Sequence, residues 1–448
     1  MGDRGVTRLP TFASGARRRR FAGLAAAALA ASSAPSAAPA QPPPARPWDI
    51  GEARHATVLA KTLDWAPTAL ASQPSCPASS PPQVRGASVF HAFPELAWHV
   101  CIREMAKKGL WVGPVHMFQP STGSWQLAVK QAGPAEIFVP YHGGGSRPYL
   151  LDGSAMVEFV GPPEMGADGT LIRVAGRGLP SVISEIRYRG VAWLCKQTAG
   201  LEATRHGYEL AVWGIVRRGH DSTIVEYGFR DDGAITFRTG HTGYNAPLQP
   251  AEAHTHTALW YVNPAIPGAA GGQSAHWLRH NGPFNTALDA IDVSNPITTE
   301  SARPWDEKQM ATLLIEGAAV NPFGNRRAYE LVPMQGGVGR HFGPKEAWTQ
   351  NDVYVTRARA AERGWIDSWA APDDYLLPAL NGETVVNQDL AIWTKTSARH
   401  RPGDEDKSVA DSLGGTTGIT LARWSGFRME PHNLFDSNPL GGPSRCGP

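Results

Sequence analysis

Residues 223–238 read TIVEYGFRDDGAITFR, and this stretch decides the fold class. Two runs of β-branched and aromatic residues flank Asp231-Asp232-Gly233, and an Asp-Gly pair between such runs is typical of a tight hairpin turn. We therefore predict two antiparallel strands, Thr223–Phe229 and Ala234–Arg238. The residues that follow, 239–247 (TGHTGYNAP), have the Gly, Asn and Pro content of a loop.

Short apolar runs of the same kind recur on both sides of this hairpin. Residues 253–262 (AHTHTALWYV) predict a core strand, and further runs stand at 97–102, 110–112, 136–139, 182–187 and 208–216. Gly, Pro and Asn separate them, and a long 3.6-residue period is almost absent. Short strands at close spacing predict a mostly β protein built as a large β-sandwich.

Bulk composition limits the classes of function. The chain has 448 residues, of which 42% are hydrophobic, so it can bury a large core. Its formal charge of +2 provides no broad basic surface for nucleic acid, and we expect a small-molecule partner. The four cysteines are too few for a disulfide framework or a Cys-based metal site. One bridge can form, and its pairing stays open.

The N-terminus predicts an export signal of twin-arginine type over residues 1–40. Arg17–Arg20 precede Phe21, a weakly apolar run at 22–31 and the small residues 38–40. A basic disordered tail is the alternative. No later run approaches the roughly 20 apolar residues needed to span a bilayer. We therefore expect an exported protein, periplasmic or secreted, whose mature form is not in the membrane.

The domain organisation follows from composition. Residues 41–47 (QPPPARP) and 73–83 (QPSCPASSPPQ) are rich in Pro and Ser, so we predict a linker region over 41–85, with residues 50–72 open to a short helix. The folded domain is expected over residues 86–448.

Two histidines on the predicted strand 253–262 form half of a metal site. His254 and His256 are two residues apart, so their imidazoles lie on the same face of a strand. In a chain with 15 histidines such spacing also arises by chance. The pair alone therefore does not establish metal binding.

Several segments resemble the catalytic domain of copper amine oxidases. Residues 219–262 match the family's hairpin and His-x-His strand, 387–406 resemble the segment with the third copper histidine, and 428–439 resemble the closing motif. Residues 139–141 (VPY) and 355–357 (VTR) match two further strands. These matches follow the family's order from Trp98 to Pro439.

The resemblance implies a copper ion bound by His254, His256 and His400. Three imidazoles with open positions suit Cu(II), although zinc can take the same ligands. Without the flanking match, His400 would read as a surface histidine. The resemblance also implies a homodimer that acts on a small-molecule substrate with O2.

One position departs from the family. Copper amine oxidases make topaquinone from a tyrosine in an Asn-Tyr-Asp/Glu motif, and a gapless alignment places His220-Asp221-Ser222 there. Asp221 occupies the precursor position, and a carboxylate cannot become a quinone. Tyr227 on the same strand and Tyr244 in the predicted loop are the alternative precursors, with core packing and loop anchoring as their ordinary roles.

The resemblance also implies a general base at Asp152. This residue follows residues 139–141 in the family's order, with a somewhat shorter segment between them. Because Gly153 comes next, a simple turn aspartate is the alternative.

Three functions remain open from the sequence. The first is a primary amine oxidase with an unusually placed quinone, which would convert an amine and O2 to an aldehyde, ammonia and H2O2. The second is a quinone-free copper oxidase of the same fold. The third is a non-catalytic copper-binding protein. Since the three-histidine set is intact, we favour a copper-dependent oxidoreductase.

Overall fold

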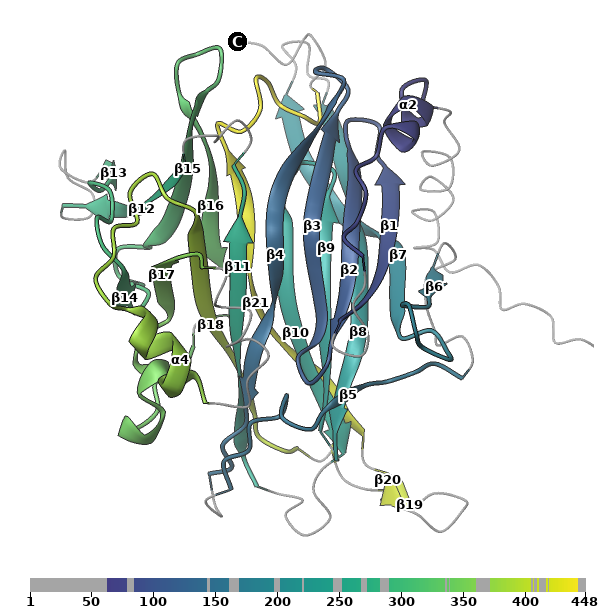
Figure 1. Ribbon diagram of the computed structural model, residues 1–448, viewed down its shortest axis with the longest axis vertical. Coiled ribbons are helices and arrows are strands. Elements are labelled where there is room, and N and C mark those ends of the chain that lie inside the picture. The colour runs from purple at the N-terminus through teal and green to yellow at the C-terminus, as the bar shows by residue number, and fades with distance from the viewer. Residues whose placement is uncertain are drawn as a thin grey trace, which may run out of the picture. The chain divides into compact units, whose positions relative to one another are not determined.

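Two large antiparallel sheets face each other in the computed structural model. The structure describes residues 63–78, 84–142, 146–160, 169–196, 202–219, 221–244, 252–266, 272–282, 290–334, 337, 339–359, 371–403, 406, 409–410, 416–417 and 419–441. Figure 1 shows strands of one sheet in front of those of the other. The predicted mostly β sandwich is confirmed.

The eight-stranded sheet has the order β1-β2-β3-β4-β11-β18-β17-β14 within the described residues. Its strands are β1 (Val84–Ala92), β2 (Ala97–Met105), β3 (Gly109–Gln119), β4 (Ser124–Phe138), β11 (His254–Pro264), β18 (Leu390–His400), β17 (Val353–Arg357) and β14 (Ser301–Arg303). The predicted core strand at 253–262 is thus β11, in the middle of the sheet.

The eleven-stranded sheet has the order β13-β12-β15-β16-β21-β10-β9-β8-β7-β6, with β5 paired to β8. Its strands are β13 (Ala290–Val293), β12 (Gln273–Asn281), β15 (Thr312–Val320), β16 (Arg326–Pro333), β21 (Ile419–His432), β10 (Ile235–Tyr244), β9 (Asp221–Arg230), β8 (Glu202–Arg218), β7 (Val182–Lys196), β6 (Thr170–Ile172) and β5 (Ala155–Met156). A separate short pair joins β19 (Val409–Ala410) and β20 (Thr416–Thr417).

The predicted hairpin is confirmed as β9 and β10. Phe229 pairs with Ile235 next to the turn, and the register continues to the pair Asp221 and Gly243. The second strand is longer than predicted, because residues 239–244 continue β10 and pair with β9 and β21. The loop prediction for 239–247 is therefore wrong for these six residues, whose ladder hydrogen bonds outweigh their turn-type composition.

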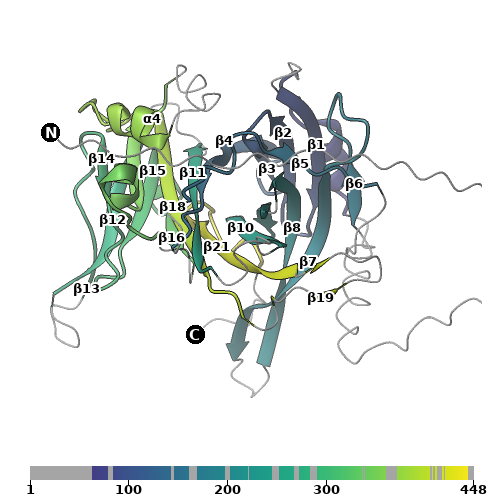
Figure 2. The same cartoon turned by 90° about the horizontal axis from the view of Figure 1, so that it is seen from below.

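Aromatic side chains from both sheets fill the space between them. Phe237 of β10 stacks on Phe427 of β21, with ring centroids 4.7 Å apart, and contacts Trp260 of β11 at 5.9 Å. All three side chains are fully buried. Figure 2, seen from below, shows the two layers on either side of this core.

The eight-stranded sheet is covered on its outer face as well. Helix α4 (Pro372–Ala379) and the 3-10 helix η1 (Pro344–Gln350) bring Tyr375, Leu376 and Trp348 against Tyr261 and Trp393 of the sheet in a second apolar cluster. Residues of β11 are therefore buried along the whole strand. A strand covered on both faces explains why residues 258–262 read as a continuous apolar run.

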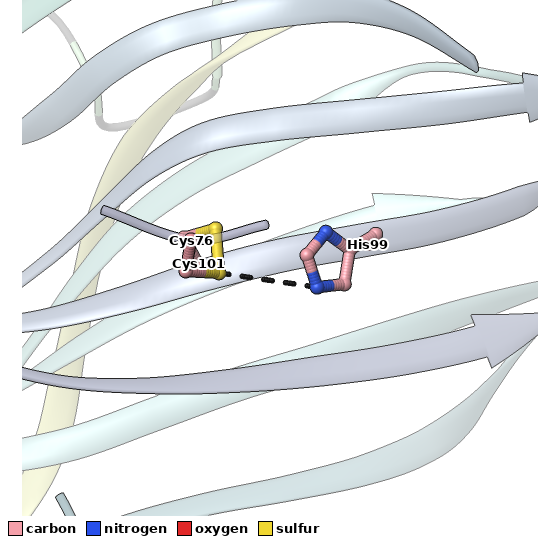
Figure 3. The surroundings of a disulfide bond; sticks show 3 residues. All are labelled: Cys76, His99 and Cys101. Carbon is pink, nitrogen blue, oxygen red and sulfur yellow. Dashed lines mark hydrogen bonds between the residues drawn. A yellow bond between two sulfur atoms is a disulfide. The ribbon is translucent and has the colours of Figure 1, made fainter. Parts of the chain in front are cut away.

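Part of the predicted linker region 41–85 packs against the sheet. Helix α2 (Ala66–Ala71) is preceded by Trp65, whose ring stacks on Phe118 at 5.5 Å. Cys76 forms a disulfide with Cys101 of β2, and His99 lies 3.9 Å from the sulfur of Cys76 (Figure 3). Helix α2 lies within residues 50–72, which the sequence left open to a short helix, and apolar contacts and a covalent bond hold residues 65–76 in place.

The remaining N-terminal predictions lie outside the described residues. These are the export signal over 1–40 and the first part of the linker region. Among the helices that the structure describes, none has the length and apolar character to cross a bilayer.

Candidate metal centre

Strands β11 and β18 bring three buried histidines together. His254 and His256 share the inner face of β11, and His254 pairs directly with His400 at the end of β18. One ligand nitrogen from each ring lies within 4.8 Å of the others. The two sequence segments, almost 150 residues apart, therefore meet at one point as the sequence predicts.

Hydrogen bonds at the outer side of two rings determine which nitrogens face inward. Nδ1 of His254 lies 3.0 Å from the carbonyl oxygen of Glu252, and Nε2 of His400 lies 3.0 Å from the carboxylate of Asp406. Because both oxygens accept, these nitrogens donate. The opposite nitrogens then carry lone pairs, and it is these two atoms that approach to 3.1 Å. A carbonyl or carboxylate behind the ring is the usual arrangement around metal-bound histidines.

This donor set fits a metal ion. Two lone pairs 3.1 Å apart repel each other unless a proton or a cation lies between them. Imidazole nitrogens bind metal ions at about 2.0–2.1 Å, so one ion reaching both atoms would form an angle of about 100°. Such an angle is compatible with the tetragonal or tetrahedral geometry of nitrogen-bound copper or zinc.

Asp406 is held as a carboxylate behind His400. Burial works to raise its pKa, but the backbone N–H of Gly403 and the ring of His400 donate to it, and the net pKa is lowered. An ionised Asp406 keeps the proton of His400 on Nε2. Nδ1 therefore stays available as a metal ligand.

Asp221 approaches this centre from the opposite sheet. It begins β9, is 8% exposed, and accepts a hydrogen bond from the hydroxyl of Tyr141 at 3.5 Å. The ring of Tyr141 packs on His254, with centroids 4.8 Å apart. Burial and the negative charge of Asp221 raise the pKa of Tyr141, so the phenol keeps its proton. Tyr141 thus connects Asp221 to a histidine of the centre.

A fourth histidine, His241, was missed by the sequence reasoning. It lies on β10 opposite Thr223 of β9, and its ring stacks on His256 at 4.3 Å with planes 16° apart. Burial, followed by the neighbouring His254, lowers the pKa of His241 to about 3, so the ring is neutral. Extending the alternation of β10 past Arg238 would have placed His241 on the inner face.

Comparisons with known proteins agree with this geometry. Residues 222–442 match the model of the copper amine oxidase enzyme domain, a segment that contains all three histidines. A primary amine oxidase of Klebsiella aerogenes is 23% identical over 337 residues, which cover 66% of this chain and 42% of that protein. The chain belongs to the copper amine oxidase family.

Solved structures show the same fold. A copper-containing benzylamine oxidase from Hansenula polymorpha superposes with a TM-score of 0.60 at 15% identity, over 82% of this chain and 64% of that one. A lysyl oxidase from Pichia pastoris gives a TM-score of 0.57 at 16% identity, over 85% and 58%. The chain thus spans less than two thirds of these family members.

Within the copper amine oxidase fold, Tyr227 is a core residue. Its side chain is fully buried, its hydroxyl donates to the carbonyl of Leu110 at 2.7 Å, and its ring contacts Phe237 and Trp260. Burial raises its pKa far above the ordinary value. These contacts give Tyr227 the packing role. Tyr244 ends β10, and its side chain, like His220, lies outside what the structure describes.

The structure places Asp152, the residue that the resemblance predicts as general base, among cations. It follows Leu151 in a turn, and burial raises its pKa more than Lys108, Arg218 and Lys107 lower it. Lys108 also lies 3.7 Å from Glu136, whose pKa is in turn raised by burial. A carboxyl group that protonates readily is suited to proton transfer. The general-base role implied for Asp152 is compatible with this and stays a prediction.

Proposed function

We propose that this protein is a copper-dependent oxidoreductase of the amine oxidase type that oxidises a small molecule with O2. The convergence of His254, His256 and His400 carries the proposal, because these are the residues that the resemblance predicts as copper ligands and their nitrogens lie within 4.8 Å of one another. The substrate loses two electrons and two protons, and O2 takes up both to give H2O2. Export of the chain and its pairing as a homodimer stay predictions.

The protein's own residues have separate roles as metal ligands, as groups that orient those ligands and as a proton-holding pair. Copper, when bound, supplies a one-electron redox centre and a Lewis acid. His254 and His400 are oriented by Glu252 and Asp406, and His256 completes the set. Across the gap between the sheets, Tyr141 and Asp221 form a phenol and carboxylate pair that can hold a proton close to His254.

We infer that the oxidation does not use a quinone at the family's usual position. The gapless alignment predicts Asp221 at this position, and the Asp221 carboxylate accepts a hydrogen bond from Tyr141, whose ring packs on His254. A substrate that reacts by forming a Schiff base on topaquinone would find no carbonyl at this residue. Oxidation of a primary amine would require a quinone made from another tyrosine.

A redox experiment on the copper-loaded protein tests this function. Primary amines, alcohols and phenols are added one at a time without O2, and the Cu(II) signal is followed by electron paramagnetic resonance. We expect at least one class to remove the signal, and admission of O2 to restore it with release of H2O2. The same sample should contain one copper per chain by elemental analysis.

One result would contradict the proposed oxidase function, and another would contradict only the inference that no quinone is used. A Cu(II) signal that survives every reductant class would favour the non-catalytic copper-binding protein. A carbonyl-reactive chromophore in the native protein would instead favour ordinary quinone-dependent amine oxidation. Tyr141→Phe serves as a matched variant, because it keeps the ring on His254 and removes only the hydroxyl.

A further inference from the structure

His241 brings a fourth imidazole to the inner face of the sandwich. It is 1% exposed, and its Nδ1 lies 3.1 Å from the hydroxyl of Thr223 on the neighbouring strand. Its Nε2 is also buried and has no hydrogen-bond partner among the described residues. Since a buried polar atom without a partner is costly, this nitrogen calls for a ligand, ion or water.

The position of the ring directs Nε2 toward the centre. His241 projects from the eleven-stranded sheet, and Nε2 is farther along the side chain than Nδ1, so it lies closer to the opposite sheet. That sheet presents His256, on which the ring stacks, and His254, whose ring lies 4.8 Å from that of His256. The unpartnered nitrogen therefore faces the three-histidine site.

Stacking argues against His241 as a fourth ligand of the same ion. Two rings that bind one ion both point a nitrogen at it, whereas His241 and His256 lie face to face with planes 16° apart. In the described residues, the converging ligand atoms come from His254, His256 and His400. His241 is a neighbour of the metal set.

A purely structural role does not account for a histidine here. Phenylalanine would stack on His256 equally well without burying a polar nitrogen. The hydroxyl of Thr223 meets one nitrogen of His241 and fixes the ring. When Thr223 donates to Nδ1, the proton of the neutral ring is on Nε2, which becomes a donor directed into the site.

We propose that Nε2 of His241 donates a hydrogen bond to the small anionic or oxygen-containing molecule that occupies the open position of the metal centre. This inference rests on the proposed copper site and adds a residue that binds the exogenous molecule. Asp221 is two residues before Thr223 on β9, the strand that pairs with the strand of His241. It therefore lies on the same face of the eleven-stranded sheet as His241. The eleven-stranded sheet thus contributes the groups that bind the exogenous molecule, and the eight-stranded sheet contributes the metal ligands.

Azide binding to the copper-loaded full chain tests this assignment. Azide is a small anion that accepts hydrogen bonds, and its charge-transfer absorbance with Cu(II) reports occupancy without turnover. We expect His241→Phe to retain one copper and to bind azide about 10-fold or more weakly. His241→Gln, which restores an N–H donor, should recover part of the affinity.

The matched control is His116→Phe. His116 of β3 is a partly buried histidine whose Nδ1 also has no partner among the described residues. Its ring stacks on that of His99, and it is not part of the metal centre. This variant should bind azide as the native protein does. Equal azide affinity in native protein and His241→Phe would overturn the proposal, and so would loss of copper from His241→Phe, which would make His241 a ligand.

The test separates this inference from the proposed function. If the native protein takes up no copper under the same loading, both are wrong. If copper and azide bind and only the His241→Phe contrast is missing, the inference alone is wrong. A clear contrast in a protein that oxidises no substrate would support the inference and contradict the oxidase function.

Discussion

The hydroxyl of Tyr141 lies 3.5 Å from the carboxylate of Asp221, although the two residues are 80 positions apart and Tyr141 is bridged to β11 while Asp221 begins β9 of the other sheet. The ring of Tyr141 also packs on His254, so the pair joins the two sides of the metal centre. The sequence predicts that Asp221 stands at the position of the tyrosine that copper amine oxidases convert to a quinone. In this chain Asp221 is instead a carboxylate that accepts a hydrogen bond from Tyr141.

Replacing His256 with Ala should remove most of the bound copper. His256 provides one of three converging nitrogens, and two imidazoles hold a divalent ion much more weakly than three. Elemental analysis after dialysis measures the effect against native protein with one copper per chain. Full copper occupancy in the variant would show that the ligand assignment is wrong.

Asp406→Asn should weaken copper binding by about 10–100-fold without abolishing it, because Asp406 orients His400 from the side of the ring that faces away from the metal site. Competition with a chelator of known affinity provides the measurement. Asp389→Asn is the matched control, since Asp389 pairs with Lys130 at the surface and is 42% exposed. Equal effects of the two substitutions would argue against the orienting role.

Asp221→Tyr should create a quinone. The native protein, loaded with copper in air, is expected to show no quinone absorbance and no oxidation of benzylamine. The variant offers copper and O2 an oxidisable ring at the family's position, and a carbonyl-reactive stain and absorbance should appear. Addition of His220→Asn and Ser222→Asp restores the whole motif. Peptide mass spectrometry that finds a quinone on native Tyr227 or Tyr244 would refute this account.

Tyr227→Phe should leave copper content unchanged and reduce the stability of the fold. The substitution keeps the ring against Trp260 but removes the hydroxyl that donates to Leu110, at a cost of about 1–3 kcal/mol for the carbonyl left without it. Denaturant unfolding and copper analysis give the two readings. Loss of a chromophore in the variant would reveal a redox role for Tyr227.

The stability of the fold should fall between pH 4.5 and pH 7 through Glu136. Burial raises its pKa from 4.5 to about 7, more than Lys108 lowers it. Between these values the folded state holds a proton that the unfolded state has released, so the free energy of unfolding decreases as pH rises. The loss is on the order of 3 kcal/mol.

Glu136→Gln isolates this contribution. The amide oxygen can still accept from the backbone N–H groups of Ile137 and Leu151, which bond Glu136 in the native protein. The variant should therefore show a flatter dependence of unfolding free energy on pH over this range. An unchanged slope would assign the effect to other groups, such as Glu95, whose pKa burial also raises to about 7.

The sequence alone determined the β-sandwich and the hairpin of β9 and β10, and it predicted the three histidines that the structure brings together. Alternation of apolar residues and an Asp-Gly turn are local signals, and the two-residue spacing of His254 and His256 already places both rings on one face. Comparison with the family's order of motifs then identified His400. These features depend on residues close together in the chain or on motifs shared with copper amine oxidases.

Only the tertiary structure decided which residues surround the metal set. His241 stands in a stretch with loop-like composition, and its place opposite His256 depends on pairing with both β9 and β21. The contact of Tyr141 with Asp221 and the anchoring of Cys76 to Cys101 likewise join distant segments. Strand pairing and the packing of one sheet on the other bring such residues together. A local pattern in the sequence does not show which distant residues become neighbours in this way.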